Sequence, residues 1–479
     1  MKLLTNNAKE YIILGLIYTL IIIPLAYFGI IMGMGIYILP AVAALPLLYF
    51  VFKKPQVWLY TSMFLFIFFT RSREAEASPF DYFFAIYYIG GLLLWILGQL
   101  LYKREKLVRN YGDMFILLYS IGVLLNFFIA YSAGVDPMNW LREATTLFLV
   151  LFYFPIRHYF YDEQKLKPFM IFFGVVLIII SCISIYTYYL ALSDIQYAFQ
   201  LASSDKINQM IFTVGVIFGL VFTFYQKKRK NEIYLLIFIG FIGVSLILTF
   251  SRTFWLIVIL MSVVLFLYLP VKKKTAMFKV GMALIVLGVL SFFLLLGDNT
   301  EMISTLLEKR ISSASSGTKD ESLQARFVEW DYALGEIQKY PLGGKGMGNK
   351  VHFYNILVSQ TFHTLNIHNG YIFFCFKLGI PMALVYLSFF LFYTFKAFFL
   401  SLRKSSLFFK ALSIACFLGF ISVLIANTTS MQFVYRDGHF TIFLLIAFTS
   451  IADYNINSPK RRENLIETNN ILPDEANNT

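Results

Sequence analysis

Long apolar stretches recur along the whole chain, separated by short polar segments. Most are long enough to cross about 30 Å of hydrocarbon as an α-helix, which satisfies its backbone hydrogen bonds within one segment. The runs 56–70, 254–269 and 439–453 are short enough that re-entrant or interfacial helices are the alternative there. By run length we place about fourteen spans, at residues 11–31, 35–52, 56–70, 80–101, 113–131, 143–160, 168–190, 208–225, 233–250, 254–269, 280–297, 368–395, 409–427 and 439–453. The pattern predicts an all-α polytopic membrane protein, with a membrane domain at 1–456 and a disordered tail at 457–479.

Composition and charge agree with that architecture. The chain is 59% hydrophobic and only 14% charged, far from the balance of a soluble domain. Its net charge of +13 is concentrated in alternate loops, and the positive-inside rule places those loops and both termini in the cytoplasm. The basic surplus therefore indicates topology and contact with anionic membrane lipids, and we expect no nucleic-acid partner.

One large polar loop, residues 298–367, interrupts the apolar pattern and faces outward by the same topology. Residues 301–310 predict a short helix, 311–322 a flexible Ser-rich stretch, and 326–340 an amphipathic helix. The apolar face of that last helix carries Phe327, Trp330, Leu334 and Ile337, whereas Glu329, Glu336 and Lys339 lie off it. We expect this helix to lie on the outer membrane surface.

Glycines end this helix, in the run 341–349. Gly344, Gly346 and Gly348 imitate a nucleotide-binding spacing, but no strand precedes them. Two interpretations stay open: a plain turn, or a nest of backbone amides that binds an anion.

Outward-facing arginines are the first candidate chemistry. Once the cytoplasmic clusters are assigned, few basic residues are left in the short outer loops: Arg71, Arg73, Arg142, Lys206, Arg252 and Arg436. Arg252 holds a guanidinium at the membrane boundary, where it can fork two hydrogen bonds to a phosphate. Arg310, Arg326 and Lys345 of the large loop could join it around a pyrophosphate. The alternatives are snorkelling to lipid phosphates for Arg252 and ordinary solvated loop residues for the others.

His368 is the candidate proton acceptor. It stands where the large loop re-enters the membrane, followed by Asn369 and Gly370, and an imidazole can take a proton near neutral pH. His363 is the rival base, and a structural helix cap is the alternative role for His368. We predict no metal site and no cofactor.

Three motifs in order resemble the O-antigen ligase and polymerase superfamily of bacterial membrane proteins. They are Ser251-Arg252-Thr253 after a span, Arg326 to Trp330 leading to the glycine-rich run 341–346, and His368-Asn369 followed by Gly379-Ile380-Pro381. The resemblance covers roughly residues 210–395. Ligases of this family often carry Gly-x-x-Gly after the His-Asn motif, and the chain departs from that pattern at Met382.

The resemblance implies a glycosyltransferase in the bacterial cytoplasmic membrane that uses undecaprenyl-pyrophosphate-linked glycan on the outer face, without a metal. Arg252, with Arg310 or Arg326, looks like the pyrophosphate clamp, and His368 is similar to the family's proposed base. Arg142, Lys345 and Asn369 are further substrate-binding candidates. We expect a polymerase of surface polysaccharide, with other assembly proteins as possible partners. The alternatives are a ligase that transfers the glycan to a lipid A-core or other acceptor, and a polysaccharide flippase.

Overall fold

The computed structural model describes residues 49–69, 85–194, 208–278, 281, 321–355 and 360–457. This part is mostly helical. Its elements are α3 (Pro55–Phe69), η1 (Ala85–Gly90), α5 (Gly91–Leu97), η2 (Gly98–Tyr102), α6 (Tyr111–Ser132), α7 (Pro137–Phe148), η3 (Leu149–Phe152), α8 (Tyr153–Tyr159), α9 (Glu163–Asp194), α11 (Gln209–Tyr225), α12 (Arg229–Leu248), α13 (Arg252–Tyr268), α16 (Glu321–Lys339), β1 (Val351–Asn355), β2 (Gln360–Thr364), α17 (Gly370–Leu378), α18 (Ile380–Leu402), α19 (Leu407–Ala426) and α20 (Arg436–Asn457).

Six of the described helices are long and apolar enough to cross a membrane: α6, α9, α12, α18, α19 and α20. Residues 86–102, α11 and α13 are shorter apolar helical segments. The predicted spans 11–31 and 280–297, and most of 35–52, lie outside the described residues. The helical membrane architecture is therefore confirmed, and the total of about fourteen spans stays a prediction.

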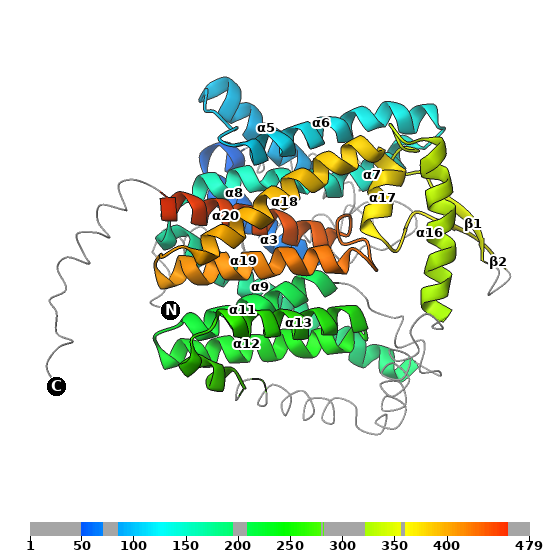
Figure 1. The fold of residues 1–479 in the computed structure, drawn as a ribbon. Coiled ribbons are helices and arrows are strands. Elements are labelled where there is room, and N and C mark those ends of the chain that lie inside the picture. Colours follow the sequence, from blue (N-terminus) through cyan, green and yellow to red (C-terminus); the bar gives the residue numbers. More distant parts are fainter. Residues whose placement is uncertain are drawn as a thin grey trace, which may run out of the picture.

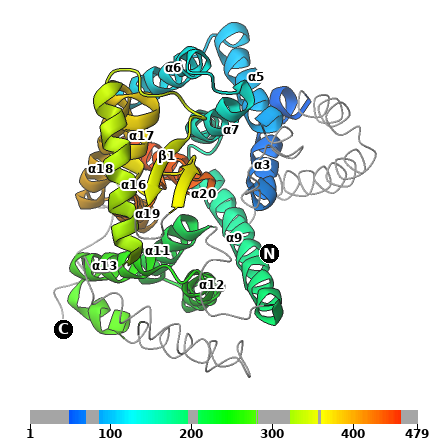
Figure 2. The ribbon, with the colours of Figure 1, turned by 90° about the vertical axis from the view of Figure 1, so that its right-hand side faces the viewer.

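The helices pack as a bundle around α20. In the most apolar part of α20, 83% of the residues are buried, against 22% in α12. Figure 1 shows most helices running side by side, with α16 standing across their ends. Seen from that end in Figure 2, α16 and β1 lie in front of the bundle. The predicted amphipathic helix is thus present and lies across one end of the bundle, and its placement on a membrane surface stays a prediction.

Basic segments of the described chain gather at the other end. The segments that contain or adjoin the basic clusters contact one another in pairs. These contacts are Arg157 to the Leu107 carbonyl, Lys167 to the ring of Phe408, Asn455 to the Tyr161 carbonyl, and Lys273 to the Phe224 carbonyl. This grouping is what alternate loops on one side of a membrane produce. Which compartment this end faces stays a prediction.

One predicted span contains a change of helix type. Residues 143–160 were predicted as a single helix, but they belong to the end of α7, the 3₁₀ turn η3, and α8. Pro155 has no backbone N–H to donate to the carbonyl of Leu151. The tighter turn just before the proline accommodates that missing hydrogen bond.

The predicted single span at residues 368–395 was wrong, and the break within it lies beside the candidate site. Residues 368–395 form two helices, because Gly379 takes a φ of +80° between α17 and α18. A side chain at position 379 would place its Cβ 2.1 Å from the carbonyl oxygen of Leu342. The nine residues of α17 extend only about 14 Å, which is too short to cross the membrane. The spanning helix here is α18 alone.

The large loop contains a β-hairpin that the sequence analysis did not predict. Strands β1 and β2 pair antiparallel, with His352 opposite His363. Residues 298–320, including the predicted helix 301–310 and most of the Ser-rich stretch, lie outside the described part of the chain.

Candidate functional site

A buried carboxylate holds His368 in place at the start of α17. Glu329 of α16 accepts a hydrogen bond from the backbone N–H of His368 at 2.5 Å through Oε1. Its other oxygen, Oε2, lies 2.8 Å from the ring nitrogen Nδ1 of the same residue. The side chain of Glu329 is 6% exposed, whereas that of His368 is 46% exposed. The imidazole is thus fixed at one nitrogen and open to solvent.

Glu329 is a candidate site residue that sequence reasoning missed. The predicted apolar face of α16 did not include Glu329, but Glu329, Ala333 and Ile337 form the inward stripe at steps of four residues. Phe327 and Leu334 of the predicted face are 43% and 46% exposed. The pattern found the helix, but of the predicted apolar face only Ile337 belongs to the inward stripe, because that stripe also contains a carboxylate and an alanine. The spacing of Glu329, Ala333 and Ile337 at steps of four residues was the available signal.

The glycine run 341–349 is a plain turn, and its amides are occupied by the protein. The donors and acceptors are Gly344 N–H to Tyr340 O, Lys345 to Phe376 O, Gly346 to Lys377 O, Met347 to Asn126 Oδ1, and Gly348 to Glu143 Oε2. Five consecutive amides therefore face protein acceptors, so the anion-nest interpretation is wrong. Positive φ values at Gly344, Gly346 and Gly348 allow this close packing.

A buried ion pair fastens this turn to the bundle. The ammonium of Lys377 in α17 lies 2.9 Å from Glu143 Oε1 of α7 and donates to the Asn349 carbonyl. The side chain of Lys377 is completely buried. Asn126 of α6 bridges the same region, since its amide donates to the Lys377 carbonyl at 3.0 Å. These contacts fix the end of α16 relative to α17, and so Glu329 relative to His368.

Asn369 caps α17. Its side-chain oxygen accepts the backbone N–H groups of Tyr371 and Ile372 at 3.0 and 3.1 Å, and its amide donates to the Thr428 carbonyl. Gly370 N–H donates to the carbonyls of Asn427 and Ser430. The start of α17 therefore rests on the loop 427–435.

The first turn of α13 contacts the same loop. Arg252, predicted to lie in the short connection between two spans, is the first residue of α13 and follows the connection Thr249–Ser251. The hydroxyl of its neighbour Thr253 lies 3.2 Å from that of Thr429. The residues next to Arg252 and next to His368, which are far apart in the sequence, thus both contact the segment 427–430.

The remaining predicted site residues have different surroundings. Arg326 lies one helical turn before Glu329 on α16, and Arg142 lies on α7 beside Glu143. Lys345 contacts the carboxylate of Glu336 at 2.6 Å. Hydrogen bonds from Lys339 and from Lys345 lower the pKa of Glu336. Arg310 lies outside the described residues.

The other histidines have no comparable environment. His363 faces His352 across the hairpin, with their Nδ1 atoms in contact, and both rings lie on an exposed hairpin. His439 is completely buried, with Nδ1 bonded to the Phe433 carbonyl. Among the described histidines of the predicted outer side, His368 is the one with a buried carboxylate and an accessible ring.

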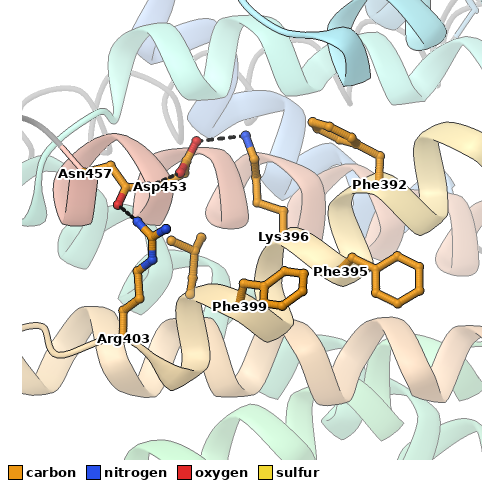
Figure 3. Close-up of a pocket in the computed structure, with 8 residues that line it drawn as sticks. Phe392, Phe395, Lys396, Phe399, Arg403, Asp453 and Asn457 are labelled. Carbon is orange, nitrogen blue, oxygen red and sulfur yellow. Dashed lines mark hydrogen bonds and ion pairs between the residues drawn. The ribbon is translucent and has the colours of Figure 1, made fainter.

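No group of three or more His, Cys, Asp or Glu side chains suited to a metal ion occurs among the described residues. An open groove of about 410 Å³ is lined by residues of α18 and the end of α20 (Figure 3). Three phenyl rings of α18 flank it, and Lys396 pairs with Asp453 there at 2.8 Å. Arg403 of this groove follows the last residue of α18, whereas His368 precedes α17. The groove is therefore not part of the candidate site.

The fold indicates a multi-pass helical membrane protein, and these contacts make His368 the centre of a candidate site at one end of the bundle. Residues 235–387 match a family model described as O-antigen ligase. This match confirms the resemblance to the O-antigen ligase and polymerase superfamily, and it includes Arg252, Arg326 and His368. The family indicates a glycosyltransferase-type enzyme that uses a lipid-linked glycan and an acceptor. No curated protein matches the chain significantly.

Proposed function

We propose that this protein polymerises oligosaccharide repeat units carried on undecaprenyl pyrophosphate, at the outer face of the bacterial cytoplasmic membrane. The observation that carries the proposal is the fixed, half-exposed imidazole of His368 at one end of an apolar bundle. The loop that supports it also contacts the residue next to Arg252. An apolar bundle beside a polar, water-accessible end suits a substrate with a polyprenyl tail and a polar glycan.

In the proposed reaction His368 accepts the proton of a sugar hydroxyl as that oxygen attacks the anomeric carbon of the lipid-linked glycan. A new C–O glycosidic bond forms, and the C–O bond to the pyrophosphate breaks. The pyrophosphate leaves with the bonding electron pair, and guanidinium groups stabilise its developing charge. Arg252 and Arg326 are the proposed donors, because arginine keeps its charge and can form paired hydrogen bonds to phosphate oxygens.

Product analysis tests the proposal. Purified protein in detergent is incubated with a lipid-pyrophosphate-linked repeat unit, and products are separated by chain length and acceptor. Longer lipid-linked chains support polymerisation. Glycan attached to a lipid-core acceptor instead identifies a ligase, and an absence of any transfer in protein that moves the same substrate across vesicles identifies a flippase. Either of these two results contradicts the polymerase proposal.

A further inference from the structure

We propose that Glu329 is the positioning residue of the site: it selects the imidazole tautomer of His368 that can accept a proton from the acceptor hydroxyl. This inference rests on the proposed function, because it assigns a partner to the proposed base. It goes beyond the family match, which assigns no role to position 329.

The two hydrogen bonds determine the tautomer. An ionised carboxylate can only accept hydrogen bonds. Oε1 of Glu329 accepts the backbone N–H of His368, and Oε2 faces Nδ1 of its ring. Nδ1 must then carry the ring proton in the neutral imidazole, which leaves the lone pair on Nε2. A neutral ring in this tautomer accepts a proton through Nε2, and the carboxylate stabilises the imidazolium that forms.

The surroundings make this contact rigid. Glu329 is 4% exposed and belongs to the same inward stripe as Ala333, which is fully buried. The turn that follows α16 is bonded to α17 through Phe376 and Lys377. On the other side, the cap formed by Asn369 anchors the first turn of α17. The carboxylate on α16 and the ring that precedes α17 are thus held by segments that hydrogen bond to each other through the turn 341–349.

Replacing the carboxylate by an amide separates positioning from packing. In Glu329→Gln the amide oxygen can still accept the backbone N–H of His368, so the shape and that contact are retained. The amide NH₂ then faces Nδ1 and can only donate. This arrangement favours the tautomer with the proton on Nε2, which has no lone pair there to accept a proton. A purely structural Glu329 tolerates this change, whereas a tautomer-selecting Glu329 does not.

Steady-state kinetics and nitrogen NMR together test the inference. We expect Glu329→Gln to lower kcat by about 10²-fold or more, the scale of lost general-base catalysis, with KM unchanged. The matched control is Glu336→Gln on the same helix, whose carboxylate contacts Lys339 and Lys345, and we expect it to keep the wild-type kcat. In ¹⁵N-histidine-labelled protein, the ring signals that disappear in His368→Ala identify His368. These signals should change from a protonated Nδ1 in wild type to a protonated Nε2 in Glu329→Gln.

The outcomes separate the two proposals. If His368→Ala is inactive but Glu329→Gln keeps the wild-type kcat, or keeps a protonated Nδ1, the positioning role is overturned and the proposed base stands. If His368→Ala transfers glycan at the wild-type rate, His368 is not the base, and the catalytic role of Glu329 is overturned with it. A loss of kcat in Glu329→Gln together with the change of tautomer supports the inference.

Discussion

The ammonium of Lys377 lies 2.9 Å from Glu143 Oε1, across 234 positions of sequence, and the Lys377 side chain is fully buried. The second oxygen of the same carboxylate accepts the backbone N–H of Gly348 at 2.7 Å. One carboxylate on α7 therefore holds both α17 and the glycine turn. The ammonium of Lys377 therefore faces protein groups on the inside of the bundle.

Removing the lysine should strongly destabilise the fold. In Lys377→Ala the Glu143 carboxylate loses its countercharge while 12% of its side chain is exposed, which costs about 3–5 kcal/mol in buried pairs. We expect a clearly lower Tm in detergent. The double change Lys377→Met with Glu143→Gln should recover part of this loss. Lys339→Ala is the matched control, since its pair with Glu336 is exposed, and an equal Tm loss there contradicts the account.

Adding a single methyl group to the glycine turn should lower the free energy of unfolding. At Gly346 a Cβ would lie 2.5 Å from the Ala130 Cα atom, and the φ of +86° is unfavourable for other residues. We expect Gly346→Ala to cost about 2 kcal/mol or more in unfolding free energy. Gly335→Ala is the control, because Gly335 lies in α16 with open space around its Cβ, and alanine is the better helix former. Equal stability of both variants refutes the close packing of the turn.

The β-hairpin should loosen in mild acid. Burial and the facing His363 lower the pKa of His352 below its ordinary value of 6.5. A base with a lowered pKa in the folded state binds fewer protons there than in the unfolded state. Hairpin stability is therefore fully present above about pH 6.5 and falls as the pH drops through the interval down to the folded pKa.

Hydrogen exchange of residues 351–354 and 360–364 measures this effect. After correction for intrinsic rates, we expect faster exchange at pH 5.5 than at pH 7.5. The difference should shrink in His352→Gln, and α20 should show no such change. A hairpin whose protection is independent of pH contradicts the assigned role of the histidine pair.

Replacing Arg252 by lysine should lower the rate of glycan transfer. Lys retains the charge but loses the planar fork that forms paired hydrogen bonds to phosphate oxygens. We expect Arg252→Lys to lower the rate of glycan transfer about 10²-fold, the scale of losing a stabilising donor. The control is Arg403→Lys. Arg403 follows the last residue of α18, outside the candidate site, and its guanidinium donates a hydrogen bond to Asn457. Wild-type transfer by Arg252→Lys removes Arg252 from the proposed clamp.

The apolar pattern predicted the helices well where one element is one apolar run, as at α6, α12 and α19. It was wrong at residues 368–395, because the break depends on Gly379 packing against Leu342, a contact from outside the run. The hairpin was not predicted because its two strands are short and lie in a polar loop.

For the site, position relative to the membrane boundary was enough to single out His368 and Arg252. Their partners were not predictable in the same way. Glu329 lies 39 positions before His368, and the predicted apolar face of α16 did not include it. The glycine turn was identified, but its amide acceptors come from α6, α7 and α17. Such contacts are set by tertiary packing, which local sequence does not record.

The initial rate of glycan transfer by His368→Ala, in purified protein with a lipid-pyrophosphate-linked repeat unit, tests the central claim most directly. The matched control is the double variant His352→Ala with His363→Ala, which changes two exposed histidines of the hairpin. We predict that His368→Ala loses about 10²-fold or more of the rate and leaves repeat units unconsumed, while the double variant transfers glycan as wild type does. Wild-type rates in a correctly folded His368→Ala protein would contradict the account.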